Sequence, residues 1–344
     1  MVTTATHQPA TAADTFAARR QSPVQRVQQV LHAYPTISPV LVLIAASVVF
    51  TIVNSRFADP QSLSLVFQQV AVVAALAIGQ TLIILTAGID LSVGAIAILS
   101  MMIMAKLSMD HGMPGIPAII VGIAVGTLAG LVNGLLVTRI KLPPFIVTLG
   151  TLSVFTALGL LYSKGQSVEA ASMPAVVNWT GTTFAVGQFR ITVGVVLVLV
   201  LYAITAFALS QTGWGKHVYA VGDDAEAARL VGIRVNRVLL SVYTVAGLIY
   251  GITAWILIGR AGSASPNALT DANLESITAV VIGGTSLFGG RGLVVGSLLG
   301  AVIVGVFRSG LSLAGVDDQY RVLAIGVLVI AAVAVDQWIR KVRA

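Results

Sequence analysis

Long apolar runs recur along the chain from residue 38 to residue 338, separated by short stretches rich in proline, glycine and charged residues. Runs of about 17–25 residues cross a bilayer as helices. Segments such as 191–209 are continuously apolar, whereas the strands of a β-barrel would alternate. We therefore predict an all-α, polytopic membrane protein with about ten transmembrane helices, at approximately 38–54, 63–86, 90–107, 117–138, 144–162, 189–209, 239–259, 275–288, 292–311 and 321–338.

An internal repeat indicates how these helices are organised. The segments GIAVGTLAGLVN (122–133) and GLVVGSLLGAVI (292–303) match at six of twelve positions, and both place glycine at every fourth residue. This spacing puts the glycines on one helix face, where a neighbouring backbone can approach closely. We predict two five-helix repeats, approximately 38–162 and 189–338, with the second inverted in the membrane. A chance coincidence of small-residue patterns is the alternative.

Composition and charge fix the class and the orientation. The chain is 57% hydrophobic and only 10% charged, which excludes a water-soluble domain. Its net charge of +7 comes from basic residues scattered between the apolar runs, with no patch typical of nucleic-acid binding. With the N-terminus inside, 13 Lys and Arg residues lie in cytoplasmic segments and 7 in outer ones, so we predict that both termini are cytoplasmic. Residues 1–35 read as a disordered cytoplasmic tail ahead of a transmembrane domain, 36–344, embedded in lipid.

One aspartate stands inside an apolar run, in ILTAGIDLSVGAI (84–96). Asp90 is predicted to cap a helix that begins near Leu91, with Ser92 in its first turn. Alternatively, the interruption at 86–90 is a broken helix that lines a polar cavity, because an ionisable group at membrane depth is costly unless it is paired or hydrated. The two interpretations are compatible.

Other polar residues within the runs raise the same choice. Glu275 opens the eighth run, and glycine pairs at 283–284 and 289–290 favour either an unwound segment or a tight cytoplasmic turn. Asn133, Gln80 and Thr81 are expected to bond a neighbouring helix or to face a solute. The candidate residues of a translocation pathway are Gln80, Thr86, Asp90, Ser92, Asn133, Glu275 and Thr285.

The largest cytoplasmic connection, 210–238, contains a short predicted helix. Asp223 is the expected N-cap, with Glu226 three residues later, and Gly232 ends the helix. An apolar stripe of three residues, Ala227, Leu230 and Val231, lies on a helix too short to be stable alone. Either the protein's own bundle or a separate cytoplasmic subunit must cover this stripe.

The sequence lacks the motifs of an enzyme. No G-x-x-x-x-G-K-[ST] phosphate loop and no G-x-S-x-G motif occurs, there are no cysteines, and the four histidines are dispersed. No carboxylate lies beside two histidines, so a metal site is not expected. We predict neither catalytic activity nor a cofactor on this chain.

Four motifs together resemble the ribose/xylose/arabinose-type permease family, the membrane subunits of bacterial ATP-binding-cassette sugar importers. They are GQTLIILTAGIDLSVGAI (79–96), GLVNGLLVTRIKLPPFIVTLGTL (130–152), GKHVYAVGDDAEAARLVGIRVNRV (215–238) and AVVIGGTSLFGGRG (279–292). With the matching order of spans, the resemblance covers approximately residues 38–338.

The resemblance implies a multi-pass permease of the bacterial inner membrane that translocates a monosaccharide. It implies a second permease copy in a homodimer, cassette ATPase subunits that bind ATP and Mg, and a periplasmic or lipid-anchored sugar-binding protein. It also implies that the ATPase docks on a coupling helix formed by Gly222, Asp223, Asp224, Glu226, Ala227, Ala228, Arg229, Leu230, Val231 and Gly232. The alternative is an ion-coupled secondary transporter that uses Asp90 or Glu275 as its ion site and needs no partner.

Overall fold

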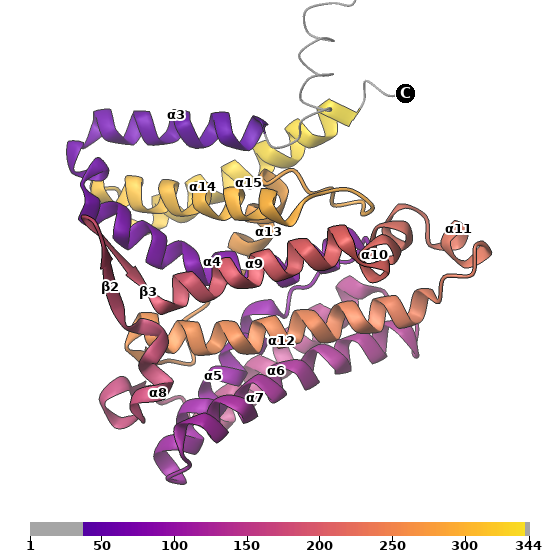
Figure 1. Cartoon of the computed structure of the whole chain (residues 1–344), viewed down its shortest axis with the longest axis horizontal. Coiled ribbons are helices and arrows are strands. Elements are labelled where there is room, and N and C mark those ends of the chain that lie inside the picture. Colours follow the sequence, from indigo (N-terminus) through magenta and orange to yellow (C-terminus); the bar gives the residue numbers. More distant parts are fainter. Residues whose placement is uncertain (1–36, 341–344) are drawn as a thin grey trace, which may run out of the picture.

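The computed structural model describes residues 37–340, so the tail predicted at 1–35 lies outside the described residues. Most of the long helices run along the longest axis of the molecule (Figure 1). In this part of the chain, seven helices are long and apolar enough to cross a membrane. They are α4 (Pro60–Leu85), α5 (Val93–Asp110), α6 (Gly115–Thr138), α7 (Pro144–Ser163), α9 (Val193–Gln211), α12 (Val235–Ala261) and α14 (Val294–Leu313).

Three further helices complete the set that the apolar runs predict. They are α3 (Ile37–Val53), α13 (Ala272–Ile282) and α15 (Asp318–Arg340). Every predicted run overlaps one helix, and the polytopic helical membrane fold is confirmed. The number of helices that cross the membrane, the inversion of the halves and the orientation stay predictions.

The structure is mostly helical, as predicted, and it adds short strands and turns that the sequence did not predict. Two antiparallel pairs form, β1 (Val168–Glu169) with β4 (Ser263–Ala264) and β2 (Thr183–Val186) with β3 (Phe189–Thr192). Thr192 ends β3 and caps α9, because its hydroxyl accepts from the backbone amide of Val195 at 3.4 Å, so the helix begins four residues after the predicted start. The remaining short elements are η1 (Ser55–Ala58), η2 (Ala170–Ser172), α8 (Ala175–Asn178) and η3 (Trp179–Gly181).

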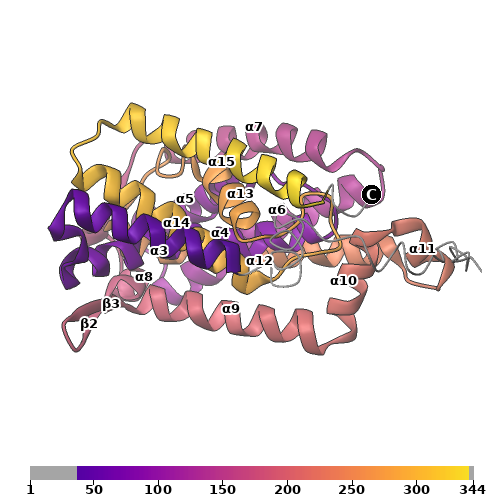
Figure 2. The ribbon, with the colours of Figure 1, turned by 90° about the horizontal axis from the view of Figure 1, so that it is seen from above.

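The bundle has two distinct ends. The β2–β3 hairpin and α8 lie at one end, called here the hairpin end, and α10 (Gly213–Asp223) and α11 (Ala225–Leu230) lie at the other, called the α11 end (Figure 1). Helix α3 begins and α15 ends toward the α11 end, which fits an even number of crossings. Seen from above, α9 follows one flank of the bundle, and α7 and α15 follow the opposite flank (Figure 2).

Glycines allow helix backbones to approach closely, as the repeat predicts. A Cβ built at Gly130 of α6 would lie 2.3 Å from the carbonyl oxygen of Tyr243 in α12. One built at Gly300 of α14 would lie 1.8 Å from the carbonyl oxygen of Ala279 in α13. The glycine faces of the two predicted repeats therefore meet different partners. Gly292 was wrongly placed on such a face, since it lies ahead of α14 with φ at +143°.

Two non-helical segments interrupt the bundle. Helix α4 ends at Leu85, and α5 begins only at Val93. Helix α13 ends at Ile282, so the eighth predicted span, which extended to residue 288, was too long. Glycines at positive φ in 283–293 prevent the helix from continuing: they are Gly284, Gly289, Gly290 and Gly292. We call residues 86–92 the first break and residues 283–293 the second break.

Candidate functional site

The first break is organised by the Asp90 carboxylate. One of its oxygens accepts from the backbone amide of Ser92 at 2.7 Å and from the Ser92 hydroxyl at 2.6 Å. The same hydroxyl accepts from the side-chain amide of Asn133 in α6 at 2.9 Å. All three residues are buried, so this chain of hydrogen bonds ties the break to α6.

The prediction that Asp90 is an N-cap was wrong. Helix α5 begins at Val93, and Ser92 occupies the N-cap position without a capping hydrogen bond from its side chain. The Asp90 carboxylate instead turns back onto Ser92, which adds a bend before the helix starts. Asn133 bonds within the protein through its amide nitrogen, and its partner lies in the break, while contact with a solute stays a prediction.

Two other helices also contact the first break. The hydroxyl of Thr148 in α7 donates to the carbonyl oxygen of Ile89 at 3.0 Å. A Cβ built at Gly88 would lie 3.1 Å from the hydroxyl of Tyr243 in α12. The first break is therefore enclosed by α6, α7 and α12.

Several buried polar atoms near these elements have no hydrogen-bond partner among the described residues. They include both amide atoms of Gln80, the amide oxygen of Asn133 and the hydroxyls of Tyr243 and Thr285. Buried polar groups normally have partners, so this part of the bundle is unusual. Thr81 and Thr86 are satisfied: the Thr81 hydroxyl lies 2.6 Å from that of Ser297 in α14, and Thr86 donates to the carbonyl of Ile83 at 2.8 Å.

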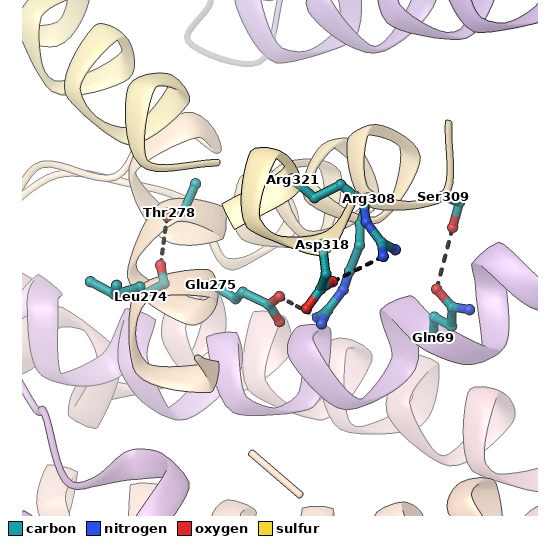
Figure 3. Close-up of polar contacts among 8 residues, drawn as sticks. All are labelled: Gln69, Leu274, Glu275, Thr278, Arg308, Ser309, Asp318 and Arg321. Carbon is teal, nitrogen blue, oxygen red and sulfur yellow. Dashed lines mark hydrogen bonds and ion pairs between the residues drawn. The ribbon is translucent and has the colours of Figure 1, made fainter. Parts of the chain in front are cut away.

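A cavity of about 600 Å³ lies among α4, α12, α13, α14 and the start of α15. Glu275 of α13 is almost fully buried and forms an ion pair with Arg308 of α14 (Figure 3). Arg321 pairs with Asp318 at 3.0 Å. The hydroxyl of Ser309 lies 3.3 Å from the side-chain oxygen of Gln69. The charged residues that line this cavity are Arg260, Asp271, Glu275, Arg308 and Arg321.

The cavity has the size and the chemistry of a small-solute site. Ligand pockets span about 300–1,000 Å³ and present a few polar groups in fixed positions. Here guanidinium groups supply hydrogen-bond donors, while carboxylate and side-chain amide oxygens supply acceptors. Ionisable residues in transmembrane helices usually mark a solute or ion pathway. The geometry can therefore hold a polar molecule at the ends of α13 and α14.

The structure places four of the seven predicted pathway residues in two separate regions. Asp90, Ser92 and Asn133 are hydrogen-bonded together, whereas Glu275 is the only predicted pathway residue in the wall of the cavity. Asn273 connects the two regions, because its side-chain oxygen accepts from the backbone amide of Gly94 at 3.0 Å. This contact joins the start of α5 to the start of α13.

Sequence reasoning missed the partners of these residues. Arg308 stands within the apolar run of α14, and the signal that singled out Asp90, an ionisable group inside such a run, applied equally to it. Arg260 and Asn273 lie close to predicted span ends, where charged and polar residues are common. Nothing in their local sequence pointed to the cavity or to α5.

At the α11 end, the capping residue differs from the prediction. Asp224, and not Asp223, caps α11, since its carboxylate accepts from the amides of Glu226 at 2.9 Å and Ala227 at 3.0 Å. Asp223 is the last residue of α10. Gly232 ends the helix as predicted, with φ at +88° and its amide bonded to the carbonyl of Arg229 at 2.9 Å.

The apolar stripe of α11 is exposed. Leu230 is 89% exposed and Val231 is 77% exposed, and α11 projects from the rest of the bundle (Figure 1). Of the two interpretations of this stripe, cover by the protein's own bundle is therefore wrong. A large apolar side chain in this position is typical of a contact surface.

Comparison with known proteins identifies the family. A family model described as branched-chain amino acid transport system / permease component matches residues 62–333. The chain belongs to this permease family. The fructose import permease protein of Rhizobium meliloti is 48% identical over 333 residues, covering 96% of this chain and 92% of the relative. The ribose import permease protein of Bacillus subtilis is 38% identical over 302 residues, covering 88% and 92%.

A third relative and the structural comparison add to this result. The D-allose transport system permease protein of Escherichia coli is 36% identical over 285 residues, covering 83% of this permease and 86% of the relative. No solved structure matches significantly. The family consists of transport components and is not an enzyme family. With seven spanning-length helices, this permease is a multi-pass protein of the bacterial inner membrane, and the matches favour the permease prediction over the ion-coupled carrier.

Proposed function

We propose that this permease is the transmembrane subunit of an ATP-driven importer and carries a monosaccharide into the cell. The named relatives are import permeases for fructose and ribose and a transport system permease for D-allose, and they align along most of the chain. The permease has no phosphate loop of its own, so ATP and Mg are bound by a partner ATPase.

The observation that supports this proposal best is the exposed stripe on α11. A six-residue helix with exposed Leu230 and Val231 is marginal unless another protein covers it. In the proposed assembly the ATPase covers this stripe in the cytoplasm, which places the hairpin end outside. There a periplasmic or lipid-anchored sugar-binding protein delivers the solute, and a second copy of the permease completes the membrane part.

The cavity beside Glu275 is the proposed place of solute contact within this chain. It adjoins the first turns of α4 and the last turns of α14, which lie toward the hairpin end. Hydroxyl groups of a sugar match the mixture of guanidinium donors and carboxylate acceptors along its wall. Helices that rearrange around the two breaks would open this cavity to either side of the membrane.

We call the exposed stripe of Ala227, Leu230 and Val231 the docking surface, and replacement of Leu230 by aspartate tests it. The charge removes the apolar contact from the exposed side of α11, so we expect ATP-dependent sugar uptake to be lost and the ATPase to dissociate from the membrane. Membrane insertion should be unchanged, because Leu230 contacts little of its own chain. The measurements are uptake in vesicles and the amount of ATPase that co-purifies with the permease.

Ile140→Asp is the matched control, since Ile140 is an exposed apolar residue in another loop at the α11 end, between α6 and α7. Normal uptake by Leu230→Asp would show that the docking surface is misplaced. Transport by the purified permease alone, driven by an ion gradient, would support the carrier instead.

A further inference from the structure

Three backbone segments meet where α10 ends. A Cβ built at Gly222 of α10 would lie only 1.7 Å from the carbonyl oxygen of Leu85 and 2.7 Å from the amide nitrogen of Gly290. Leu85 is the last residue of α4 before the first break, and Gly290 lies in the second break. Only glycine allows this approach. We call the contact of Gly222, Leu85 and Gly290 the glycine junction.

Hydrogen bonds hold the same segments together. The amide of Gly290 donates to the carbonyl of Leu85 at 3.0 Å, which joins the second break to the end of α4. The hydroxyl of Tyr219 in α10 donates to the carbonyl of Gly292 at 2.8 Å. A Cβ at Gly289 would lie 2.5 Å from the carbonyl oxygen of Gly222, so that residue also packs on backbone. The second break is thus bound to both α4 and α10.

The glycine junction lies between the docking surface and two polar regions. These regions are the hydrogen-bonded residues around Asp90 and the cavity beside Glu275. Asp224 alone separates α10 from α11, so a displacement of α11 acts directly on α10. The first break runs from the junction to Asp90, and the second break follows α13, which bears Glu275. Backbone contacts without intervening side chains cannot adapt by changing rotamers, and closely packed interiors transmit strain.

We propose that the glycine junction transmits movement of α11 to both breaks, with Gly222 and Tyr219 as positioning residues for transport. This inference rests on the proposed function, because it requires a partner that moves α11. When α11 moves, α10 displaces the end of α4 together with the second break. The hydrogen-bonded residues around Asp90 and the cavity beside Glu275 then change shape together, although no residue of the first break lines the cavity.

A second contact of α10 provides a competing route. The indole nitrogen of Trp214, near the start of α10, donates to the hydroxyl of Ser241 in α12 at 2.8 Å. This contact would pass movement to α12 and bypass the second break. Ser241→Ala removes this hydrogen bond together with a local one that the Ser241 hydroxyl donates to the carbonyl of Val238 at 2.7 Å, while Tyr219→Phe removes one at the junction, so the two variants compare the routes.

The test uses the permease assembled with its ATPase and sugar-binding protein in proteoliposomes. Fructose, ribose and D-allose, the sugars named for the relatives, are the probes. For Gly222→Ala we expect ATP hydrolysis to continue while sugar uptake per ATP falls by about 2- to 30-fold, the usual range for residues that couple two sites. Tyr219→Phe should reduce the same ratio by a smaller factor. Gly213→Ala is the control on α10, since a Cβ there meets nothing within 4 Å.

The outcomes separate this inference from the function on which it rests. If the unaltered permease binds no ATPase or takes up no sugar, the proposed function fails. If the unaltered permease couples sugar uptake to ATP hydrolysis and Tyr219→Phe does so equally well, the junction does not transmit the movement of α11. This conclusion holds whether or not Gly222→Ala assembles. A loss of coupling in Ser241→Ala alone would likewise overturn the inference in favour of α12.

Discussion

At the scale of single residues, Glu275 and Arg308 form an ion pair in the wall of the cavity. Glu275 is buried, whereas the Arg308 side chain is 42% exposed. The carboxylate therefore depends on its partner more than the guanidinium does. A buried charge needs such a partner, and a polar solute that enters the cavity competes for the same hydrogen bonds.

Neutralising Glu275 should impair transport more than stability. In Glu275→Gln we expect the free energy of unfolding to fall by only about 1 kcal/mol, because the exposed Arg308 keeps contact with water. Sugar uptake should fall about tenfold or more, the effect of roughly 1.4 kcal/mol on a transport barrier, since the cavity loses its buried negative acceptor. Uptake assays and thermal unfolding of the purified permease measure the two effects.

Asp110→Asn is the control for this prediction, because it neutralises the partner of Lys106, 3.3 Å away, outside the cavity. Equal uptake by both variants would argue that the charge of Glu275 has no part in transport.

Asp90 and Glu275 were recognisable in the sequence because each is ionisable within or beside an apolar run. Their contacts were not. Ser92 and Asn133 are 41 residues apart, and Glu275 and Arg308 are 33 apart, so each pair depends on how whole helices pack. The capping errors at Asp90 and Asp223 have a local cause: a residue one or two positions later, Asp224 or Ser92, occupies the N-cap position.

At the scale of elements, the packing of α6 on α12 depends on small residues. Gly126 and Gly130 of α6 face Gly247 and Gly251 of α12 at backbone distance. Helices in lipid associate through van der Waals packing and hydrogen bonds, so close approach determines which helices become neighbours. Because α12 also encloses the first break, the position of this helix affects the surroundings of Asp90.

A single methyl group on α6 should separate the two helices. In Gly130→Ala, a Cβ would lie 2.3 Å from the Tyr243 carbonyl oxygen, and we expect a loss of about 1–3 kcal/mol of stability from overpacking. Gly150→Ala in α7 is the control: its Cβ meets nothing within 4 Å, so the substitution should be neutral or stabilising by up to about 1 kcal/mol. Thermal unfolding in detergent compares them, and an unchanged Gly130→Ala would contradict the packing.

Hydropathy located the ten helices that correspond to apolar runs, but it did not place all of their ends correctly. The length of α13 was overestimated because 283–288 contains Leu287 and Phe288, and apolar content alone does not reveal glycines held at positive φ. The β2–β3 hairpin was missed because β3, Phe189–Thr192, runs directly into the apolar sequence of α9. The repeat predicted close helix contacts correctly and could not specify the partner helices.

At the scale of the whole molecule, the two ends differ in character. The hairpin end has the β2–β3 strands and borders the charged cavity, and the α11 end has the exposed stripe and the glycine junction. The excess of basic residues predicts that the α11 end is cytoplasmic. The charge pattern predicted only an orientation, whereas the positions of the cavity and the glycine junction became known from the folded chain.

The orientation can be measured directly because the chain has no cysteine. Single cysteines at Ala185 in the hairpin and at Ala227 in α11, both exposed, would report the two ends. We expect a membrane-impermeant maleimide to label Ala185→Cys in cells with a permeabilised outer membrane. In cells that lack the ATPase, which would otherwise cover this residue in the proposed assembly, Ala227→Cys should be labelled only after the inner membrane is opened. The unaltered chain is the blank, and the reverse pattern would invert the proposed topology.

The shortness of α13 has a consequence for biogenesis. Its 11 residues extend about 16 Å, roughly half of a hydrocarbon core, and irregular backbone in 283–293 follows the helix. A ribosome-bound translocation channel releases helices into lipid according to their own hydrophobic length, which this segment lacks. Backbone amide and carbonyl groups outside a helix would also lack hydrogen-bond partners among the lipid acyl chains. We therefore expect α13 to enter the bilayer late, after α4 and α14, which pack against it, have formed a sheltered space.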